Sequence, residues 1–180
     1  MEGRERLRLF VALLLPPSVL VQLADWQERA FRGVRNVRVV PRENLHLTLA
    51  FLGGRPADEL PAIVEVVRSA AGGIAPPVFE PVRYRETRSV GMIALTDLEG
   101  RATRLAEALF DGLEGLGVYE RERRQWLPHV TVVRFRQPPR LTPELPGLGQ
   151  VMSSEVAVMM SRLGPSGSQY EVLESVSLGG

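Results

Sequence analysis

The chain has 180 residues, 44% of them hydrophobic, which suits one domain with a sizeable core and argues against an intrinsically disordered protein. The net charge of +1 argues against a protein that holds nucleic acid mainly through general basicity, and all 22 basic residues are arginine. The absence of cysteine excludes disulfides and thiolate chemistry and is compatible with a reducing compartment.

The first predicted element is a strand over residues 8–15, centred on the apolar run that begins at Phe10. Basic residues precede this run, as they do in a signal peptide. However, the run is short, Pro16-Pro17 follows it, and no small-residue cleavage site comes next. We therefore interpret it as a buried strand. Since no run approaches the ~20 apolar residues of a membrane span, we expect a cytoplasmic protein with no membrane partner.

Further along the chain, apolar spacing predicts helices over 17–32, from Asp58 to about Ala71, and over 100–116. Alternating or apolar runs predict strands over 45–52 (ended by Gly53-Gly54), 78–86, 90–97, 128–135, 151–162 and 169–178. Neighbouring strands are joined by short turns, so we expect two antiparallel sheets with helices outside them. This is an α+β fold.

Each of the two histidines opens the same short phrase. His46 begins His46-Leu47-Thr48-Leu49, and His129 begins His129-Val130-Thr131-Val132. Only six threonines are present, so the repeated pattern is improbable by chance. In a strand, the His and Thr of each phrase point to one face while the apolar residues point to the other. Each phrase therefore offers an imidazole beside a hydroxyl.

An offset of 83 residues, the separation of the two histidines, also superimposes other elements. Phe10-Val11-Ala12-Leu13 falls on Ile93-Ala94-Leu95-Thr96, and the helix that begins near residue 17 falls on the one that begins near residue 100. Both copies run strand, turn, helix, extended linker and His-x-Thr strand. We therefore predict a single domain, residues 1–180, made of two duplicated lobes with motifs at 46–49 and 129–132.

These features resemble the 2H phosphoesterase superfamily, and within it the RNA 2′,3′-cyclic phosphodiesterases, which are also called 2′–5′ RNA ligase-like proteins. The resemblance covers nearly the whole chain. Its landmarks are Arg8-Leu9-Phe10-Val11-Ala12, Asn44-Leu45-His46-Leu47-Thr48-Leu49-Ala50-Phe51-Leu52-Gly53, Pro128-His129-Val130-Thr131-Val132 with Arg134, and the tail Ser161–Tyr170.

The resemblance implies two pseudo-symmetric lobes, each an antiparallel sheet with helices on its outer face, and an active-site cleft between them. It implies metal-independent hydrolysis of RNA or nucleotide 2′,3′-cyclic phosphate to a 2′-phosphomonoester, with no cofactor. His46 and His129 would be the catalytic acid and base, His46 being assigned as the acid. Two imidazoles can divide this work near neutral pH. The pairing is better supported than the order.

Thr48 and Thr131 are predicted to donate hydrogen bonds to the phosphate oxygens, although threonine is also common in strands simply for its β propensity. Arg134 is a third predicted phosphate ligand, with a surface ion pair as the alternative. Regular alternation would turn Arg134 away from His129, so its role requires a bulge or a strand end. Phe51 either contacts substrate or packs in the core.

Two other functions stay open: a 2′–5′ RNA ligase that uses the same residues, and a non-catalytic nucleotide- or RNA-binding module. The run Arg121–Trp126 is either an RNA-facing loop or a solvated approach to the second motif. We interpret Tyr170 as a packing residue in the closing hairpin. With no apolar stripe left over, we expect a monomer.

Overall fold

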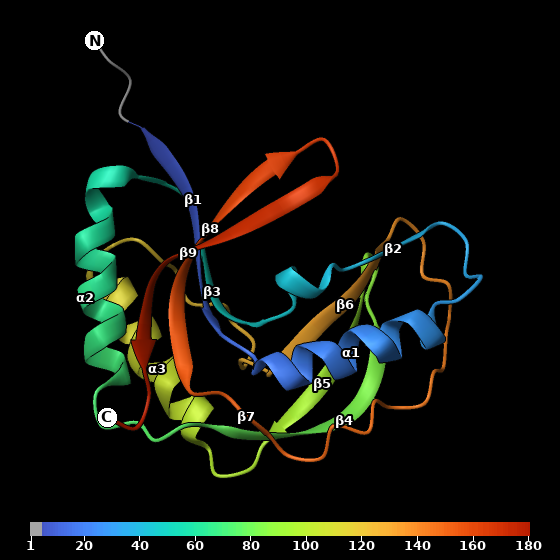
Figure 1. Ribbon diagram of the computed structural model, residues 1–180. Helices are drawn as coiled ribbons and strands as arrows, with labels where there is room; N and C mark the ends of the chain where they lie inside the picture. Colours follow the sequence, from blue (N-terminus) through green and yellow to red (C-terminus); the bar gives the residue numbers. More distant parts are fainter. Residues whose placement is uncertain (1–4) are drawn as a thin grey trace.

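The structure is a computed structural model that describes residues 5–180 (Figure 1), so the first four residues of the predicted domain lie outside it. Its helices are α1 (Pro17–Ala30), α2 (Leu60–Ala71) and α3 (Arg101–Gly115), with the short 3-10 turns η1 (Arg42–Asn44) and η2 (Ala57–Glu59). Its strands are β1 (Arg6–Leu13), β2 (Val37–Val39), β3 (Leu47–Pro56), β4 (Val78–Glu86), β5 (Val90–Asp97), β6 (His129–Phe135), β7 (Val151–Met152), β8 (Glu155–Gly164) and β9 (Gly167–Ser177).

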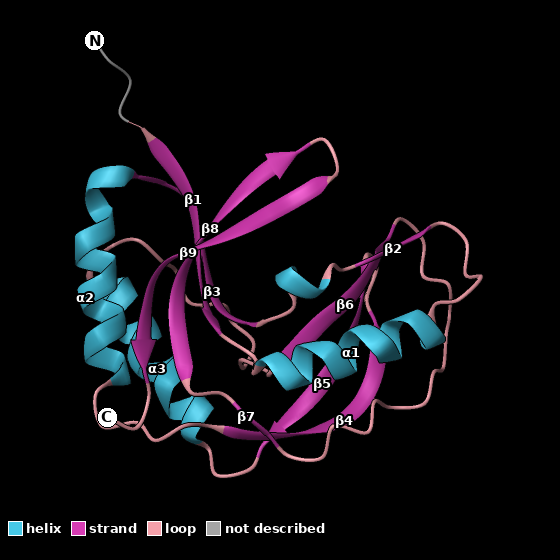
Figure 2. Cartoon of the chain, viewed as in Figure 1, coloured by secondary structure: helices cyan, strands magenta, loops and turns pink. Residues whose placement is uncertain are grey.

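The strands form one antiparallel sheet that is strongly curled (Figure 2). The strand order is β7-β4-β5-β6-β3-β1-β8-β9, with β2 also paired to β6. In the middle of this path, β3 and β6 are joined by a single residue pair, Leu47 with Val130. The α+β prediction is confirmed, and the two expected sheets are the two halves of one continuous sheet.

The first half of the sheet contains β3, β1, β8 and β9, and the second half contains β6, β5, β4 and β7 together with β2. Each half is covered by helices on its outer side. The helix α1 follows β1 in the chain but packs on the second half, where Trp26 contacts Tyr84 of β4 with a ring-centroid distance of 6.4 Å. On the first half, α2 packs against α3, β8 and β9 (Figures 1 and 2). The helix α3 follows β5 of the second half but packs on the first half. Each of α1 and α3 therefore covers the half of the sheet opposite to the one whose strand it follows. This exchange ties the halves together.

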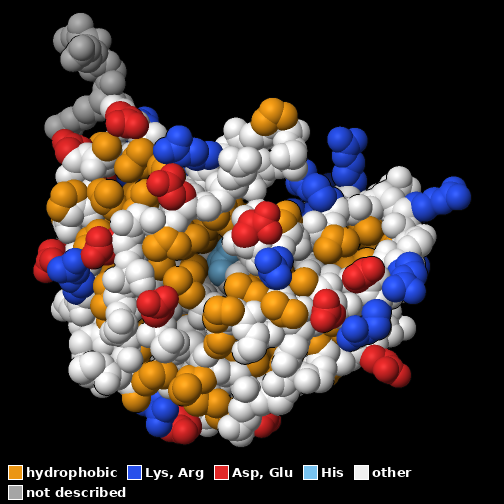
Figure 3. Space-filling model, viewed as in Figure 1, with side chains coloured by type: hydrophobic (Ala, Val, Ile, Leu, Met, Phe, Trp, Pro, Cys, Tyr) orange, Lys and Arg blue, Asp and Glu red, His pale blue; other side chains and the backbone are white. Residues whose placement is uncertain are grey.

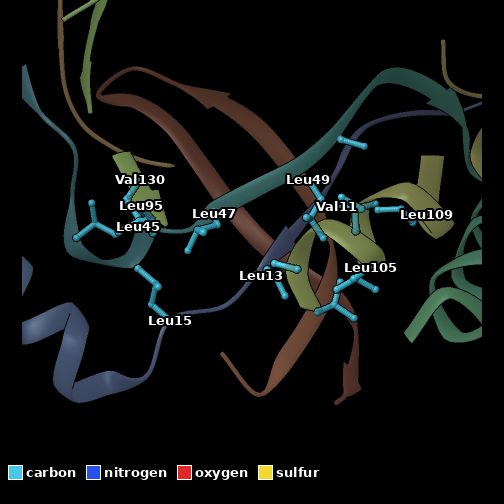
Figure 4. Packing of buried hydrophobic residues seen from close by; sticks show 14 of the residues in the cluster. Val11, Leu13, Leu15, Leu45, Leu47, Leu49, Leu95, Leu105, Leu109 and Val130 are labelled. Atoms are coloured by element: carbon cyan, nitrogen blue, oxygen red, sulfur yellow. The ribbon is translucent and has the colours of Figure 1, made fainter. Parts of the chain in front are cut away.

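The core is continuous through the junction of the two halves. Leu47 is fully buried there. In Figure 4 it lies between one group that includes Leu15, Leu45, Leu95 and Val130 and another that includes Val11, Leu13, Leu49, Leu105 and Leu109. Burying this apolar surface is the main stabilising contribution to the fold, and it also fixes the strands that carry the two motifs.

Several predicted boundaries are wrong. Gly53-Gly54 do not end the third strand, because β1 continues to pair with β3 as far as Pro56. The predicted strand over 151–162 is interrupted at Ser153-Ser154: β7 pairs with β4, while β8 pairs with β1. The strand β2 was expected to be part of an extended linker. The apolar run at Phe10 is the buried strand β1, as predicted.

Within residues 5–180, no helix is long and apolar enough to cross a membrane.

Candidate active site

The two His-x-Thr motifs meet at the junction between the halves of the sheet. Because Leu47 pairs with Val130 in an antiparallel manner, His46 lies on the side of Thr131, and Thr48 lies on the side of His129. All four side chains are partly buried and line one cleft. The structure thus brings together the four residues that the repeated phrase singled out. Figure 3 shows a histidine side chain at the centre of the face, within a hollow.

Both imidazoles are held in the same way by the main chain. The Nδ1 atom of His46 lies 2.7 Å from the carbonyl oxygen of Asn44, and that of His129 lies 2.9 Å from the carbonyl oxygen of Leu127. A carbonyl oxygen can only accept, so Nδ1 carries the proton in both rings. In the neutral form, each Nε2 atom is therefore the basic nitrogen.

His46 has the more enclosed environment. Its ring lies 5.0 Å from that of Phe10 and 5.4 Å from that of Tyr170. The hydroxyl of Thr48 donates to its Nε2 atom over 2.8 Å. Burial lowers the pKa of His46 from 6.5 to about 4, and the positive charge of Arg134 and the nearby His129 add to this. The His46 ring is therefore neutral at pH 7.

A β-bulge follows the threonine in each motif. Opposite β1, Thr48 pairs with Ala12 and Ala50 pairs with Val11, which leaves Leu49 without a partner. The same interruption occurs in β6, where Val132 is the unpaired residue opposite β5. One extra residue reverses the alternation beyond it. The fifth residue after each histidine therefore returns to the face that the histidine occupies.

The residues redirected by the bulges are Phe51 and Arg134, which occupy equivalent places in the two halves. Phe51 is 68% exposed, so it does not pack in the core. Arg134 is exposed as well, and both side chains line the cleft. The bulge that a phosphate-binding Arg134 requires is therefore present. The cleft thus has an aromatic ring beyond one motif and a guanidinium group beyond the other.

The buried side chain of Gln27, on α1, supports the second bulge. Its Nε2 group donates to the carbonyl oxygen of Val132 over 2.8 Å and to that of Val40 over 3.0 Å. The amide of Val40 also donates to the Val132 carbonyl. A bulge disrupts the regular ladder, so these bonds satisfy main-chain groups that β5 does not reach.

Two further aromatic residues that were not among the predicted site residues line the cleft. Tyr170, interpreted as packing, reaches the cleft because the β8–β9 hairpin lies beside η1, where the Asn44 side chain donates to the Ser168 carbonyl over 2.8 Å. Trp126 lies in the cleft wall, and its indole N–H donates to the Thr48 carbonyl over 3.1 Å. The position of Tyr170 depends on a tertiary contact, so the local pattern carried no signal for it, whereas Trp126 belongs to the run Arg121–Trp126, for which an RNA-facing loop was one of two interpretations; the whole run lines the cleft.

Among residues 5–180, no three His, Asp or Glu side chains lie close enough together to hold a metal ion. The acidic residues that line the cleft are Glu107 and Glu122, and each pairs with an arginine.

Comparisons with known proteins show the family of the chain. Residues 13–83 match the family described as LigT like phosphoesterase. The chain is 35% identical to the RNA 2′,3′-cyclic phosphodiesterase of Thermus thermophilus over 97% of its own length and 91% of that relative. The chain belongs to the LigT-like phosphoesterase family.

Solved structures of LigT-like proteins have the same fold. The crystal structure of TT0787 of Thermus thermophilus matches with a TM-score of 0.82 and 35% identity, covering 96% of this chain and 98% of that one. Apo LigT of Escherichia coli matches with a TM-score of 0.79 and 25% identity, covering 97% of this chain and 98% of that one. The curled sheet is thus the fold of this family.

Proposed function

We propose that the protein hydrolyses the 2′,3′-cyclic phosphate of RNA ends or nucleotides to a 2′-phosphomonoester, with His46 and His129 as acid and base. The observation that carries this proposal is the pair of imidazoles at the junction of the sheet, each with its Nδ1 atom bound to a main-chain carbonyl, so that Nε2 is the basic nitrogen of both rings. The Thermus thermophilus relative, named RNA 2′,3′-cyclic phosphodiesterase, supports the choice of substrate.

The reaction needs one proton taken up and one delivered. A water oxygen attacks phosphorus and gives its proton to one imidazole, while the bond from phosphorus to the 3′ oxygen breaks and that oxygen takes a proton from the other. Motifs on two sides of the same phosphate suit the in-line geometry of this displacement. In the active enzyme, one imidazole is therefore protonated on Nε2 and the other is neutral.

The resemblance assigns the acid role to His46, yet this ring is neutral at pH 7 in the free protein because burial lowers its pKa to about 4. An anion close to an imidazole raises its pKa. We propose that the bound phosphate supplies this anion, so that His46 acquires its proton only when substrate is present. His129 then takes the proton from water.

The neighbouring side chains have complementary roles in the proposal. Once His46 is protonated on Nε2, that nitrogen no longer accepts from the Thr48 hydroxyl. The hydroxyls of Thr48 and Thr131 then donate to the nonbridging oxygens, whose negative charge grows in the transition state. Arg134 faces the same site and binds the phosphate through its guanidinium group. Phe51, largely exposed on the other side, offers its ring to the base of the terminal nucleotide.

Metal independence is part of the proposal. The two imidazoles can supply both proton transfers, and Arg134 supplies positive charge for the phosphate. The described part of the chain offers no cluster of metal-binding side chains in the cleft. The reaction therefore has the groups it needs without a cation.

The test is hydrolysis of adenosine 2′,3′-cyclic phosphate in the presence of EDTA by the wild type, His46→Ala and His129→Ala, with 2′-AMP and 3′-AMP separated. We expect the wild type to form 2′-AMP. Because each histidine carries out one proton transfer, kcat should fall about 100-fold or more in either variant.

Full activity in either histidine variant would contradict the proposed mechanism. Loss of wild-type activity in EDTA, with recovery on adding a divalent metal, would contradict metal independence. Tight nucleotide binding without turnover, on both the mononucleotide and an RNA end, would favour a binding module instead.

A further inference from the structure

Two rows of paired residues cross the second half of the sheet and connect the second motif to β4. In an antiparallel sheet, directly paired residues point to the same face, and neighbouring strands are about 4.8 Å apart. Arg83 and Arg85, at the β4 ends of the rows, are therefore about 10 Å from the backbone of the second motif, on the cleft face. The rows are Arg83–Ala94–His129 and Arg85–Met92–Thr131.

The side chain between the two arginines confirms which face they occupy. Tyr84 points to the other side of β4, where its ring lies 6.4 Å from that of Trp26 and 6.3 Å from that of Phe31. That side is covered by α1. Arg83 and Arg85 are exposed and line the cleft.

The cleft concentrates positive charge, although the whole chain has a net charge of only +1. Its lining includes six arginines and two glutamates, and both glutamates form ion pairs, Glu107 with Arg121 and Glu122 with Arg124. By contrast, neither Arg83 nor Arg85 makes a side-chain hydrogen bond or ion pair with any residue of the described range 5–180. The two guanidinium groups are thus available to an anionic ligand.

The size of the cleft points to more than one nucleotide. Its volume is about 1060 Å³, at the upper limit of the roughly 300–1,000 Å³ that is usual for small-molecule sites. An RNA strand whose cyclic 3′ end lies between the histidines must continue away from them. The floor formed by Ala94 and Met92 leads from the motif to the two arginines.

We propose that Arg83 and Arg85 form a subsite for the phosphodiester groups of an RNA strand just upstream of its cyclic end. This inference rests on the proposed function and deepens it: the preferred substrate is an RNA end rather than a mononucleotide. Guanidinium groups suit this role because they bind phosphate oxygens in a bidentate way and stay charged at any physiological pH.

The experiment measures kcat/KM for two substrates, adenosine 2′,3′-cyclic phosphate and a short oligoadenylate that ends in 2′,3′-cyclic phosphate, at several salt concentrations. We expect the wild type to prefer the oligonucleotide by about tenfold or more. With two phosphates bound, the logarithm of kcat/KM for the oligonucleotide should fall with that of salt with a slope about 1.4 steeper than for the mononucleotide. In Arg83→Gln/Arg85→Gln, the preference and the extra slope should both be lost.

The matched control is Arg29→Gln/Arg32→Gln, which removes the same charge from exposed positions at the end of α1, on the covered side of the sheet. The control should keep the wild-type preference. Equal kcat/KM for both substrates in the wild type, an unchanged preference in the Arg83/Arg85 variant, or an equal loss in the control would each overturn the subsite alone. A wild type that hydrolyses neither substrate would overturn the proposed function and the subsite with it.

Discussion

His46 and His129 show how much of the candidate active site is decided by contacts with residues close in the sequence. The carbonyl that fixes each ring belongs to the residue two positions earlier, so the motif carries its own means of orienting the imidazole. The sequence was sufficient to single out both rings and both threonines, which the structure brings to one cleft. It could not predict that His46 is neutral, because this depends on Phe10 and Tyr170, which arrive from distant strands.

The low pKa of His46 can be measured directly, because His129→Asn leaves it as the only imidazole in the chain. Burial disfavours the charged ring, so we expect its NMR signals to titrate near pH 4 instead of 6.5. A midpoint near 6.5 would contradict the lowering of the His46 pKa by burial.

At the scale of elements, the two bulges decide which side chains reach the cleft. A regular β6 would turn Arg134 away from His129, and a regular β3 would do the same to Phe51. A local signal does exist, because two consecutive buried apolar residues, Leu49-Ala50 and Val132-Val133, interrupt the alternation after each threonine. By contrast, β2 is too short, at three residues, to show a pattern of its own.

Gln27 lets the contribution of the second bulge be tested. In Gln27→Leu, the carbonyl of Val40 loses its side-chain donor inside the protein, which should cost about 1–3 kcal/mol of unfolding free energy. The Val132 carbonyl keeps only the hydrogen bond from the Val40 amide, so the bulge should loosen, Arg134 should shift away from the phosphate and KM for adenosine 2′,3′-cyclic phosphate should rise about tenfold. Steady-state kinetics and urea unfolding measure the two effects.

The same substitution at Gln22, which is exposed on α1, is the matched control and should change neither quantity. A double-mutant cycle separates positioning from general damage. If Gln27 acts through Arg134, then Gln27→Leu should have little effect on KM in an Arg134→Gln background. A tenfold rise in that background would show that Gln27 acts on the site by another route.

For the whole molecule, the sequence predicted the class of fold and the order of its elements, because strand and helix periods are local properties. It did not predict that the two sheets join into one, because the junction consists of the single pair Leu47–Val130. Nor did the sequence show that α1 follows a strand of the first half but covers the second, or that α3 follows a strand of the second half but covers the first. Such exchange is set by packing between distant segments. The duplication that suggested two lobes stays a prediction.

The junction makes a prediction about how the molecule unfolds. Leu47 is fully buried at the point where the halves meet, and the core that surrounds it is continuous. Leu47→Ala should therefore cost about 2–5 kcal/mol. Since α1 follows β1 of the first half but covers the second, and α3 follows β5 of the second half but packs with α2 on the first, neither half keeps its core without the other. Unfolding in urea should stay a single transition, with tryptophan fluorescence and far-UV circular dichroism coincident in both the wild type and the variant.

Leu98→Ala, at a position that is 39% exposed, is the control and should cost less than about 1 kcal/mol. Two separate transitions in Leu47→Ala would instead mean that the halves are independent folding units joined only at the active site.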